Sequence, residues 1–277
     1  MNLIIQGPEV PPRLLDEISR HACSSGVEQL AEHAYRLKDA RFGATIPPLC
    51  EAARVDYAFV PESAKLSGFG LVVMDMDSTL ITIECIDEIA DMLGIKPEVA
   101  AVTEAAMRGE IDFSESLRRR VALLSGLDES ALSRVYEERL KLSPGAEIML
   151  SKLKSLGIKT LLVSGGFTFF TDRLKTRLDL DFTASNTLEI RDGKLTGKVL
   201  GTIIDAQGKA DWLERIRLQL NLDRAQVIAI GDGANDLKML AQAGTGIAYH
   251  AKPVVREKTQ YAFNYCGLDA LINLFQN

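Results

Sequence analysis

The hydrophobic pattern of this chain repeats one unit: a short continuous apolar run, a polar turn, and then helical spacing. The runs are Leu71–Met74, Thr160–Val163, Val227–Ile230 and Gly246–Tyr249. Runs of this length without polar alternation are typical of buried parallel strands. Helical spacing follows in residues 146–156, 169–178, 209–220 and 235–243. The alternation predicts an α/β fold, with a doubly wound and mainly parallel sheet.

A long insertion separates the first of these strands from the others. Residues 84–142 carry no strand signal, and their apolar spacing predicts four helices, over 86–93, 96–107, 114–124 and 129–140. Gly94, Gly109 and Gly126 punctuate them. We therefore expect a core domain formed by residues 67–83 and 143–277, with a helical-bundle cap, residues 84–142, inserted after its first strand.

The N-terminal residues 1–66 have a different pattern. Leu3–Ile5 and Tyr57–Val60 are predicted as strands, and helices are expected over 14–22 and after Pro47-Pro48. This order resembles a small amino-acid-binding regulatory module of the ACT type, in truncated form. A packing or dimerisation module is the more ordinary interpretation, so a homodimer formed through this α+β module is an expectation.

Composition and charge limit the partners of the protein. The 277 residues include 32 Lys and Arg against 38 Asp and Glu, a net charge of −6, which does not favour a nucleic-acid binder. No apolar run approaches the roughly 18 residues of a membrane span. The N-terminus lacks the basic start and long apolar stretch of a signal peptide. The four cysteines form no CxxC pair, which favours a reduced, cytoplasmic setting.

Several chemistries are excluded by residues that the sequence lacks. Its three histidines, His21, His33 and His250, are widely scattered and form no HExxH motif, which excludes a zincin-type site. Neither GxxxxGK[ST] nor GxGxxG occurs, so the usual nucleotide-binding fingerprints are missing. No cysteine stands in a phosphate-cradling loop.

Polar residues stand where the predicted strands end. They are Asp75 and Asp77 after the first strand, Ser164-Gly165-Gly166 after the second, Asp232, Asn235 and Asp236 after the third, and Lys209 at the start of a helix. The carboxyl ends of parallel strands meet at one edge of a sheet, where ligands bind. Clustered carboxylates suit Mg²⁺, and helix N-termini with a lysine suit a phosphate. A metal beside a phosphate site indicates phosphoryl transfer.

With no cysteine loop or histidine pair available, a carboxylate is the expected nucleophile, which would form an aspartyl-phosphate. Asp75 follows the strand directly. Asp77 is offset by two residues, which places it to exchange a proton with the leaving oxygen.

The motifs Asp-x-Asp-x-Thr, Ser-Gly-Gly, Lys and Gly-Asp-Gly-x-Asn-Asp, in this order over residues 70–250, resemble the haloacid dehalogenase superfamily. The resemblance implies that Asp75 is the nucleophile and Asp77 the general acid and base. It implies Mg²⁺ bound by Asp75, the Asp77 backbone carbonyl and Asp232. It also implies that Ser164, the N–H of Gly165 and Lys209 hold the phosphoryl oxygens. Asn235 and Asp236 would support the metal waters and the loop.

Within this superfamily, the segments 74–79, 84–90 and 113–121 resemble the phosphoserine phosphatase family. The resemblance implies a small-molecule substrate, O-phospho-L-serine, and the last step of serine biosynthesis. Glu84 would pair with the substrate ammonium group and Arg120 with its carboxylate, while Phe113 and Met107 would close the apolar side of the pocket.

The motifs leave two alternatives open. The same core could transfer the phosphoryl group from phosphoserine to another amino-acid alcohol, such as homoserine. Alternatively, the N-terminal module could belong to a serine-sensing protein without catalysis, although the intact acidic motifs disfavour this. By composition alone, the run Arg118–Arg120 would be a solvated face.

Overall fold

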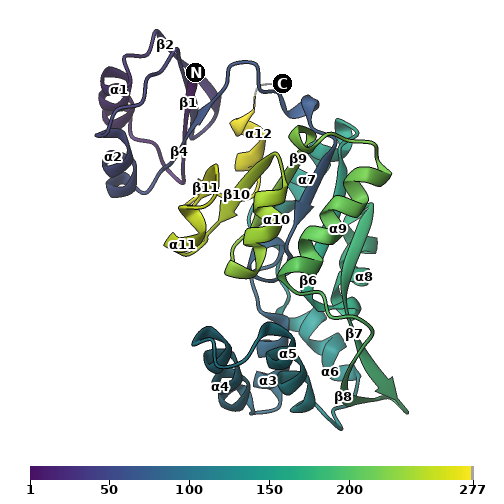
Figure 1. The fold of residues 1–277 in the computed structure, drawn as a ribbon. Coiled ribbons are helices and arrows are strands. Elements are labelled where there is room, and N and C mark those ends of the chain that lie inside the picture. Colours follow the sequence, from purple (N-terminus) through teal and green to yellow (C-terminus); the bar gives the residue numbers. More distant parts are fainter. Residues whose placement is uncertain (276–277) are drawn as a thin grey trace.

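The computed structural model describes residues 1–275, and its centre is a seven-stranded sheet in the order β11-β10-β9-β5-β6-β7-β8 (Figure 1). All neighbouring strands in it run parallel except β7 and β8. The strands are β5 (Leu71–Met74), β6 (Lys159–Phe167), β7 (Phe182–Arg191), β8 (Lys194–Leu200), β9 (Val227–Gly231), β10 (Thr245–Tyr249) and β11 (Tyr261–Phe263). The predicted doubly wound sheet is confirmed.

Helices cover both faces of this sheet because the buried strands are apolar on both sides. Val72 and Met74 pack in one cluster, whereas Leu71 and Val73 pack in another. The first cluster takes in residues of α7 (Ala146–Ser155), α8 (Thr168–Leu178) and α12 (Ala270–Leu274). The second takes in residues of α9 (Ala206–Gln219), α10 (Leu237–Gln242) and α11 (Pro253–Arg256). Alternate strand residues thus face opposite helix layers.

The insertion is helical, as its spacing predicts. It contains α3 (Cys85–Met92), α4 (Lys96–Met107), α5 (Phe113–Ala122), α6 (Ser130–Arg134) and a further helical turn, Val135–Arg139. The hairpin of β7 and β8 was not predicted; it reaches out from the core and packs against α5 (Figure 1). Backbone hydrogen bonds join Gly126 and Leu127 to Leu195. The insertion is therefore supported by core residues far away in the sequence.

The N-terminal residues form a second, antiparallel sheet in the order β2-β3-β1-β4. Its elements are β1 (Asn2–Gln6), α1 (Pro12–His21), β2 (Gly26–Ala31), β3 (Ala34–Lys38), α2 (Ile46–Ala53) and β4 (Asp56–Val60). The sequence pattern resolved only the first and last of these strands. The strand β2 lies at an edge and alternates between half-buried and exposed positions, which explains its weak hydrophobic signal.

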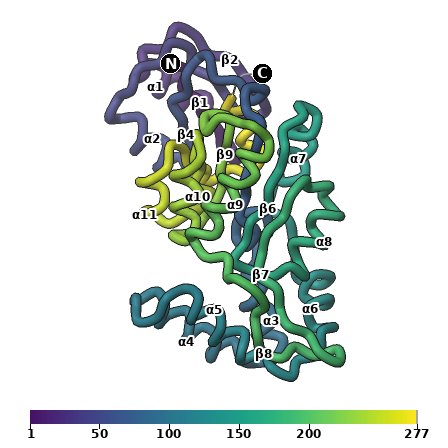
Figure 2. The backbone as a smooth tube through the Cα atoms, turned by 45° about the vertical axis from the view of Figure 1, so that its right-hand side comes forward, coloured from purple at the N-terminus to yellow at the C-terminus, as the bar shows by residue number. Residues whose placement is uncertain are grey.

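A buried carboxylate joins the N-terminal sheet to the core. Asp56, at the start of β4, is 2% exposed and accepts hydrogen bonds from the backbone N–H groups of Asn264, Tyr265 and Cys266, at 2.8, 3.0 and 3.0 Å. The N-terminal sheet and the insertion lie at opposite ends of the core in both views (Figures 1 and 2). Within residues 1–275, no helix is long and apolar enough to cross a membrane.

Candidate active site

The carboxyl ends of three adjacent strands bring the predicted acidic and hydroxyl residues together. Met74 of β5 is paired with Leu162 of β6 and Ile230 of β9, so the residues that follow them emerge side by side. The backbone N–H of Asp75 donates to the carbonyl of Ile230 at 3.0 Å. Asp75, Ser164 and Asp232 therefore reach one place from three separate parts of the chain.

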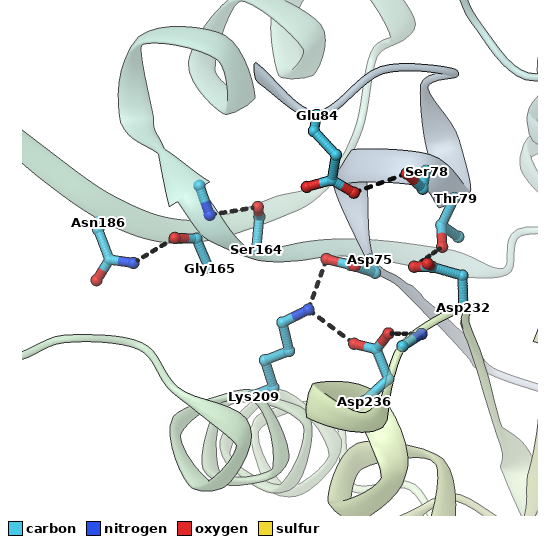
Figure 3. Close-up of polar contacts among 12 residues, drawn as sticks. Asp75, Ser78, Thr79, Glu84, Ser164, Gly165, Asn186, Lys209, Asp232 and Asp236 are labelled. Carbon is cyan, nitrogen blue, oxygen red and sulfur yellow. Dashed lines mark hydrogen bonds and ion pairs between the residues drawn. The ribbon is translucent and has the colours of Figure 1, made fainter. Parts of the chain in front are cut away.

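The side chain of Lys209 connects Asp75 to Asp236 (Figure 3). Its Nζ is 2.6 Å from Oδ1 of Asp75 and 2.7 Å from Oδ1 of Asp236, and the lysine is 1% exposed. It stands in the first turn of α9, which Asp205 caps by accepting the N–H groups of Gln207 and Gly208. Burial lowers the pKa of Lys209, but the two carboxylates outweigh burial and raise it above its ordinary value.

The carboxylates of Asp75, Asp232 and Asp236 offer oxygens that all lie within 4.8 Å of one another. Burial and the neighbouring charge of Asp236 raise the pKa of Asp75 well above its usual range and that of Asp232 to about 6. One lysine cannot offset three carboxylates, and hard oxygen ligands suit a divalent cation such as Mg²⁺. The donor set therefore fits a metal. Asp236 belongs to it, whereas no side-chain oxygen of Asp77 does.

Asp77 lies in a sharp turn after β5. The chain turns at Ser78, which has a left-handed φ of 56°, and Oδ1 of Asp77 accepts the N–H of Cys85 at 3.2 Å. Burial, and then repulsion by Glu84, raise the pKa of Asp77 to about 7. A carboxyl group with such a pKa is suited to both giving and taking a proton near neutral pH.

The insertion supplies the opposite side of the site. Glu84, just before α3, accepts a hydrogen bond from the hydroxyl of Ser78 at 2.7 Å. Nε of Arg120, on α5, is buried and has no hydrogen-bond partner among the described residues. Burial lowers the pKa of Arg120, while Asp87, Glu84 and Asp77 counteract it. An unpartnered guanidinium nitrogen of this kind is ready to bind an anion.

A cavity of about 130 Å³ lies between these two sides. Nine of its lining residues were candidates in the sequence: Asp75, Asp77, Glu84, Phe113, Arg120, Gly165, Lys209, Asp232 and Asn235. The ring of Phe113 packs closely against the loop residues Ser164–Gly166 near the end of β6. A Cβ on Gly165 would lie 2.8 Å from Cζ of Phe113. Ser164, in the same loop, is 1% exposed, and its hydroxyl accepts the N–H of Gly166 at 2.8 Å.

The expectation for Met107 does not fit the structure. Met107 is the last residue of α4, is 69% exposed and does not line the cavity. Only Val99 is buried on this helix, so its packing does not bring its end toward the site. The apolar wall is instead formed, beside Phe113, by Ile86, Leu117 and Phe167.

A family model for haloacid dehalogenase-like hydrolases matches residues 72–241. The chain belongs to this family. A phosphoserine phosphatase of Polaromonas sp. is 55% identical over 215 residues, which cover 76% of this chain and 91% of that relative. A probable phosphoserine phosphatase of Vibrio cholerae, solved unliganded, superposes with a TM-score of 0.88 at 41% identity, covering 99% of this chain and 86% of that one.

A structure described as a substrate-bound phosphoserine phosphatase complex gives a TM-score of 0.70 at 36% identity. It covers 75% of this chain and 99% of that one, so about a quarter of this haloacid dehalogenase-like hydrolase has no counterpart there. The family model likewise begins only after the N-terminal sheet.

Two further contacts hold charged groups of this hydrolase site in place, and both come from residues of the sequence motifs, Thr79 and Asp236. Thr79 donates its hydroxyl to Oδ1 of Asp232 at 3.2 Å, which orients that carboxylate. Asp236 accepts the N–H of Gly233 at 3.0 Å. Because Asp236 also contacts Lys209, this bond connects the loop after β9 to the buried lysine. Each contact fixes one charged group before a substrate arrives, so the site can stabilise developing charge without rearranging.

Proposed function

We infer that this chain is a phosphoserine phosphatase: it hydrolyses O-phospho-L-serine to L-serine and inorganic phosphate, the last step of serine biosynthesis. The observation that carries this inference is that two sets of charged residues face each other across one small cavity. Asp75 and Lys209 stand on the core side, and Glu84 and Arg120 stand on the side of the inserted helices. This arrangement favours a substrate that carries one ammonium and one carboxylate group in addition to its phosphate.

In the first half of the reaction, a carboxylate oxygen of Asp75 attacks phosphorus and the bond from phosphorus to the serine oxygen breaks. Asp77 donates its proton to that leaving oxygen, so L-serine departs as a neutral alcohol. The raised pKa of Asp77, about 7, supports this role, because a substantial fraction of the carboxyl groups then carries a proton at neutral pH.

In the second half, Asp77 accepts a proton from a water molecule as the water oxygen attacks phosphorus. The bond between phosphorus and the Asp75 oxygen breaks, and inorganic phosphate leaves. Both residues return to their starting protonation states. Lys209 holds phosphoryl oxygens in both halves, together with Ser164 and the N–H of Gly165, so the negative charge is met by fixed donors.

We propose that Mg²⁺ is the resident metal, held by Asp75, Asp232 and the backbone carbonyl of Asp77. Asp236, whose carboxylate lies in the same cluster, and Asn235, which lines the cavity, support its water ligands. When bound, the metal neutralises charge on the phosphoryl oxygens and on the carboxylates around them.

The substrate is selected by pairing each of its charges. The carboxylate of Glu84 accepts the ammonium group, and the guanidinium of Arg120 binds the carboxylate through its unpartnered Nε and its terminal nitrogens. Phe113 covers the apolar part of the substrate. A charge buried without such a partner would cost several kcal/mol, so these residues discriminate against phosphomonoesters that lack either group.

We also propose that three parts of the chain have separate roles. Residues 67–83 and 143–277 form the catalytic core and residues 84–142 the cap. Residues 1–66 form a separate module, where the edge strand β2 has a hydrogen-bonded neighbour on one side only and is available for a homodimer. A cytoplasmic setting is supported by the four cysteines, each of which is free.

The test is a phosphate-release panel over small phosphomonoesters in the presence of Mg²⁺. We expect O-phospho-L-serine to give the highest kcat/KM, above O-phosphoethanolamine and glycerol phosphate. A second arm adds homoserine and measures phosphohomoserine. Equal rates on all esters would refute the proposed specificity, and phosphohomoserine in place of free phosphate would identify a phosphotransferase.

A further inference from the structure

The loop residues Ser164, Gly165 and Gly166 lie near the end of β6, where that strand bulges away from its pairing with β7. The strands β6 and β7 pair at Val163 with Ala184, and next at Phe167 with Asn186. The first strand advances four residues over this interval and the second only two. The three loop residues are thereby released from the ladder, and their backbone groups need other partners.

The side chain of Asn186 supplies one of these partners. Its Nδ2 donates to the carbonyl oxygen of Gly165 at 2.8 Å (Figure 3). The N–H of the same peptide unit, that of Gly166, donates to Oγ of Ser164 at 2.8 Å. The chain has no cis peptide among its described residues, so carbonyl and N–H point in opposite directions. This peptide plane is therefore held at both ends.

The other end of the Asn186 amide reaches a second catalytic element. Its Oδ1 accepts the N–H of Ile204 at 2.8 Å. Ile204 precedes Asp205, the residue that caps α9, and Lys209 stands in the first turn of that helix. Asn186 thus bridges the two elements that present Gly165 and Lys209 to the phosphate side of the cavity.

Asn186 itself does not line the cavity and is 2% exposed. Its position requires a side chain that donates from one end and accepts at the other within a short reach. Among the short side chains, only an asparagine amide offers an N–H donor and a separate oxygen acceptor. Aspartate keeps the acceptor and loses the donor, and alanine loses both.

We propose that Asn186 is a positioning residue for phosphate binding, which sets the orientation of the Gly165–Gly166 peptide relative to Lys209. The inference rests on the proposed function for its role in turnover, but its effect on binding of inorganic phosphate does not depend on which ester is hydrolysed. A misplacement of about 1 Å at such a site can cost on the order of 100-fold in rate.

The experiment compares Asn186→Ala and Asn186→Asp with a control from the same strand, Ser185→Ala. Among the described residues, the side chain of Ser185 forms one hydrogen bond, at 2.7 Å to Thr171 of α8, and none to the Ser164–Gly166 segment or to α9. For each purified full-length variant, the thermal midpoint is measured, then the affinity for inorganic phosphate with MgCl₂ by calorimetry, and then kcat and KM for phosphoserine.

We expect the Asn186 variants to bind phosphate at least tenfold more weakly than the parent, with kcat also reduced, and Ser185→Ala to stay within twofold. If Asn186→Ala folds and binds phosphate within twofold of the parent, the proposal is overturned. Should that variant not fold, the nearly isosteric Asn186→Asp decides by the same criterion. A parent protein that binds phosphate without releasing it from phosphoserine would refute the proposed function alone.

Discussion

Arg120 offers the sharpest test of how the substrate is chosen. Its Nε is buried and has no hydrogen-bond partner within residues 1–275, and it lies on the side of the cavity opposite Asp75 and Lys209. Two hydrogen bonds from its guanidinium group to a carboxylate would contribute roughly 1.5 to 2 kcal/mol each. Removal of the side chain should therefore weaken phosphoserine binding by about 3 to 4 kcal/mol, or some 10²- to 10³-fold in KM.

The sequence provides a matched control beside it. Arg119, its neighbour on α5, has a side chain 55% exposed and forms an i,i+4 ion pair with Glu115. Such surface pairs contribute on the order of 0.3 to 0.5 kcal/mol. We expect Arg119→Ala to retain the parent KM, whereas Arg120→Ala raises it and Arg120→Lys only partly restores it, because a lysine cannot form the planar fork.

The assay measures phosphate release from O-phospho-L-serine and from O-phosphoethanolamine, which has no carboxylate. Arg120→Ala should raise KM for phosphoserine and leave the already weak reaction of phosphoethanolamine nearly unchanged. If the two substrates lose equally, Arg120 acts by supporting the fold of the inserted helices. The assignment of the carboxylate to this residue would then be wrong.

Asp77, the metal site and Asp56 can each be tested separately. Asp77→Asn should fold like the parent, by its thermal midpoint, and lose roughly 10²- to 10⁴-fold in kcat, because it cannot transfer the proton; parent-like turnover would contradict the role. Chelation by EDTA should abolish phosphate release and added Mg²⁺ should restore it, whereas undiminished release after chelation would exclude a required metal. Asp56→Ala should lower the free energy of unfolding, measured with urea, by about 3 kcal/mol because three partly buried N–H groups lose their acceptor; an unchanged value would show that water replaces the carboxylate.

The parts of the fold that the sequence predicted are those with local, periodic signals. The strands β5, β6 and β9 each contain a continuous apolar run. These runs are followed by Asp75, by Ser164 and by Gly231-Asp232, respectively. Because parallel strands share one edge, the run endings alone placed the acids, the hydroxyl and the following helix N-termini together. The helices of the insertion followed from their spacing in the same way.

One element was missed although its signal is local, whereas the other misses depend on contacts between distant residues. In the hairpin of β7 and β8, the alternating apolar residues Leu188, Ile190 and Leu195 flank the dipeptide Asp192-Gly193. Asp-Gly is typical of a two-residue hairpin turn, and both residues have left-handed φ angles, 51° and 74°. Met107 belongs to the helical pattern of α4, but spacing along a helix does not tell which end faces the cavity. Asn186 belongs to no sequence motif. Its two side-chain hydrogen bonds reach the carbonyl of Gly165, 21 residues earlier, and the N–H of Ile204, 18 residues later, and no local pattern indicates such contacts.

Trapping the covalent intermediate shows whether Asp75 attacks phosphorus. The protein is mixed with phosphoserine and Mg²⁺, quenched in acid within a single turnover, digested and analysed by mass spectrometry. We expect one added phosphoryl group on the peptide that contains Asp75, with none in Asp75→Asn. Phosphate release without any phosphorylated peptide, or a phosphoryl group carried by a different residue, would contradict it.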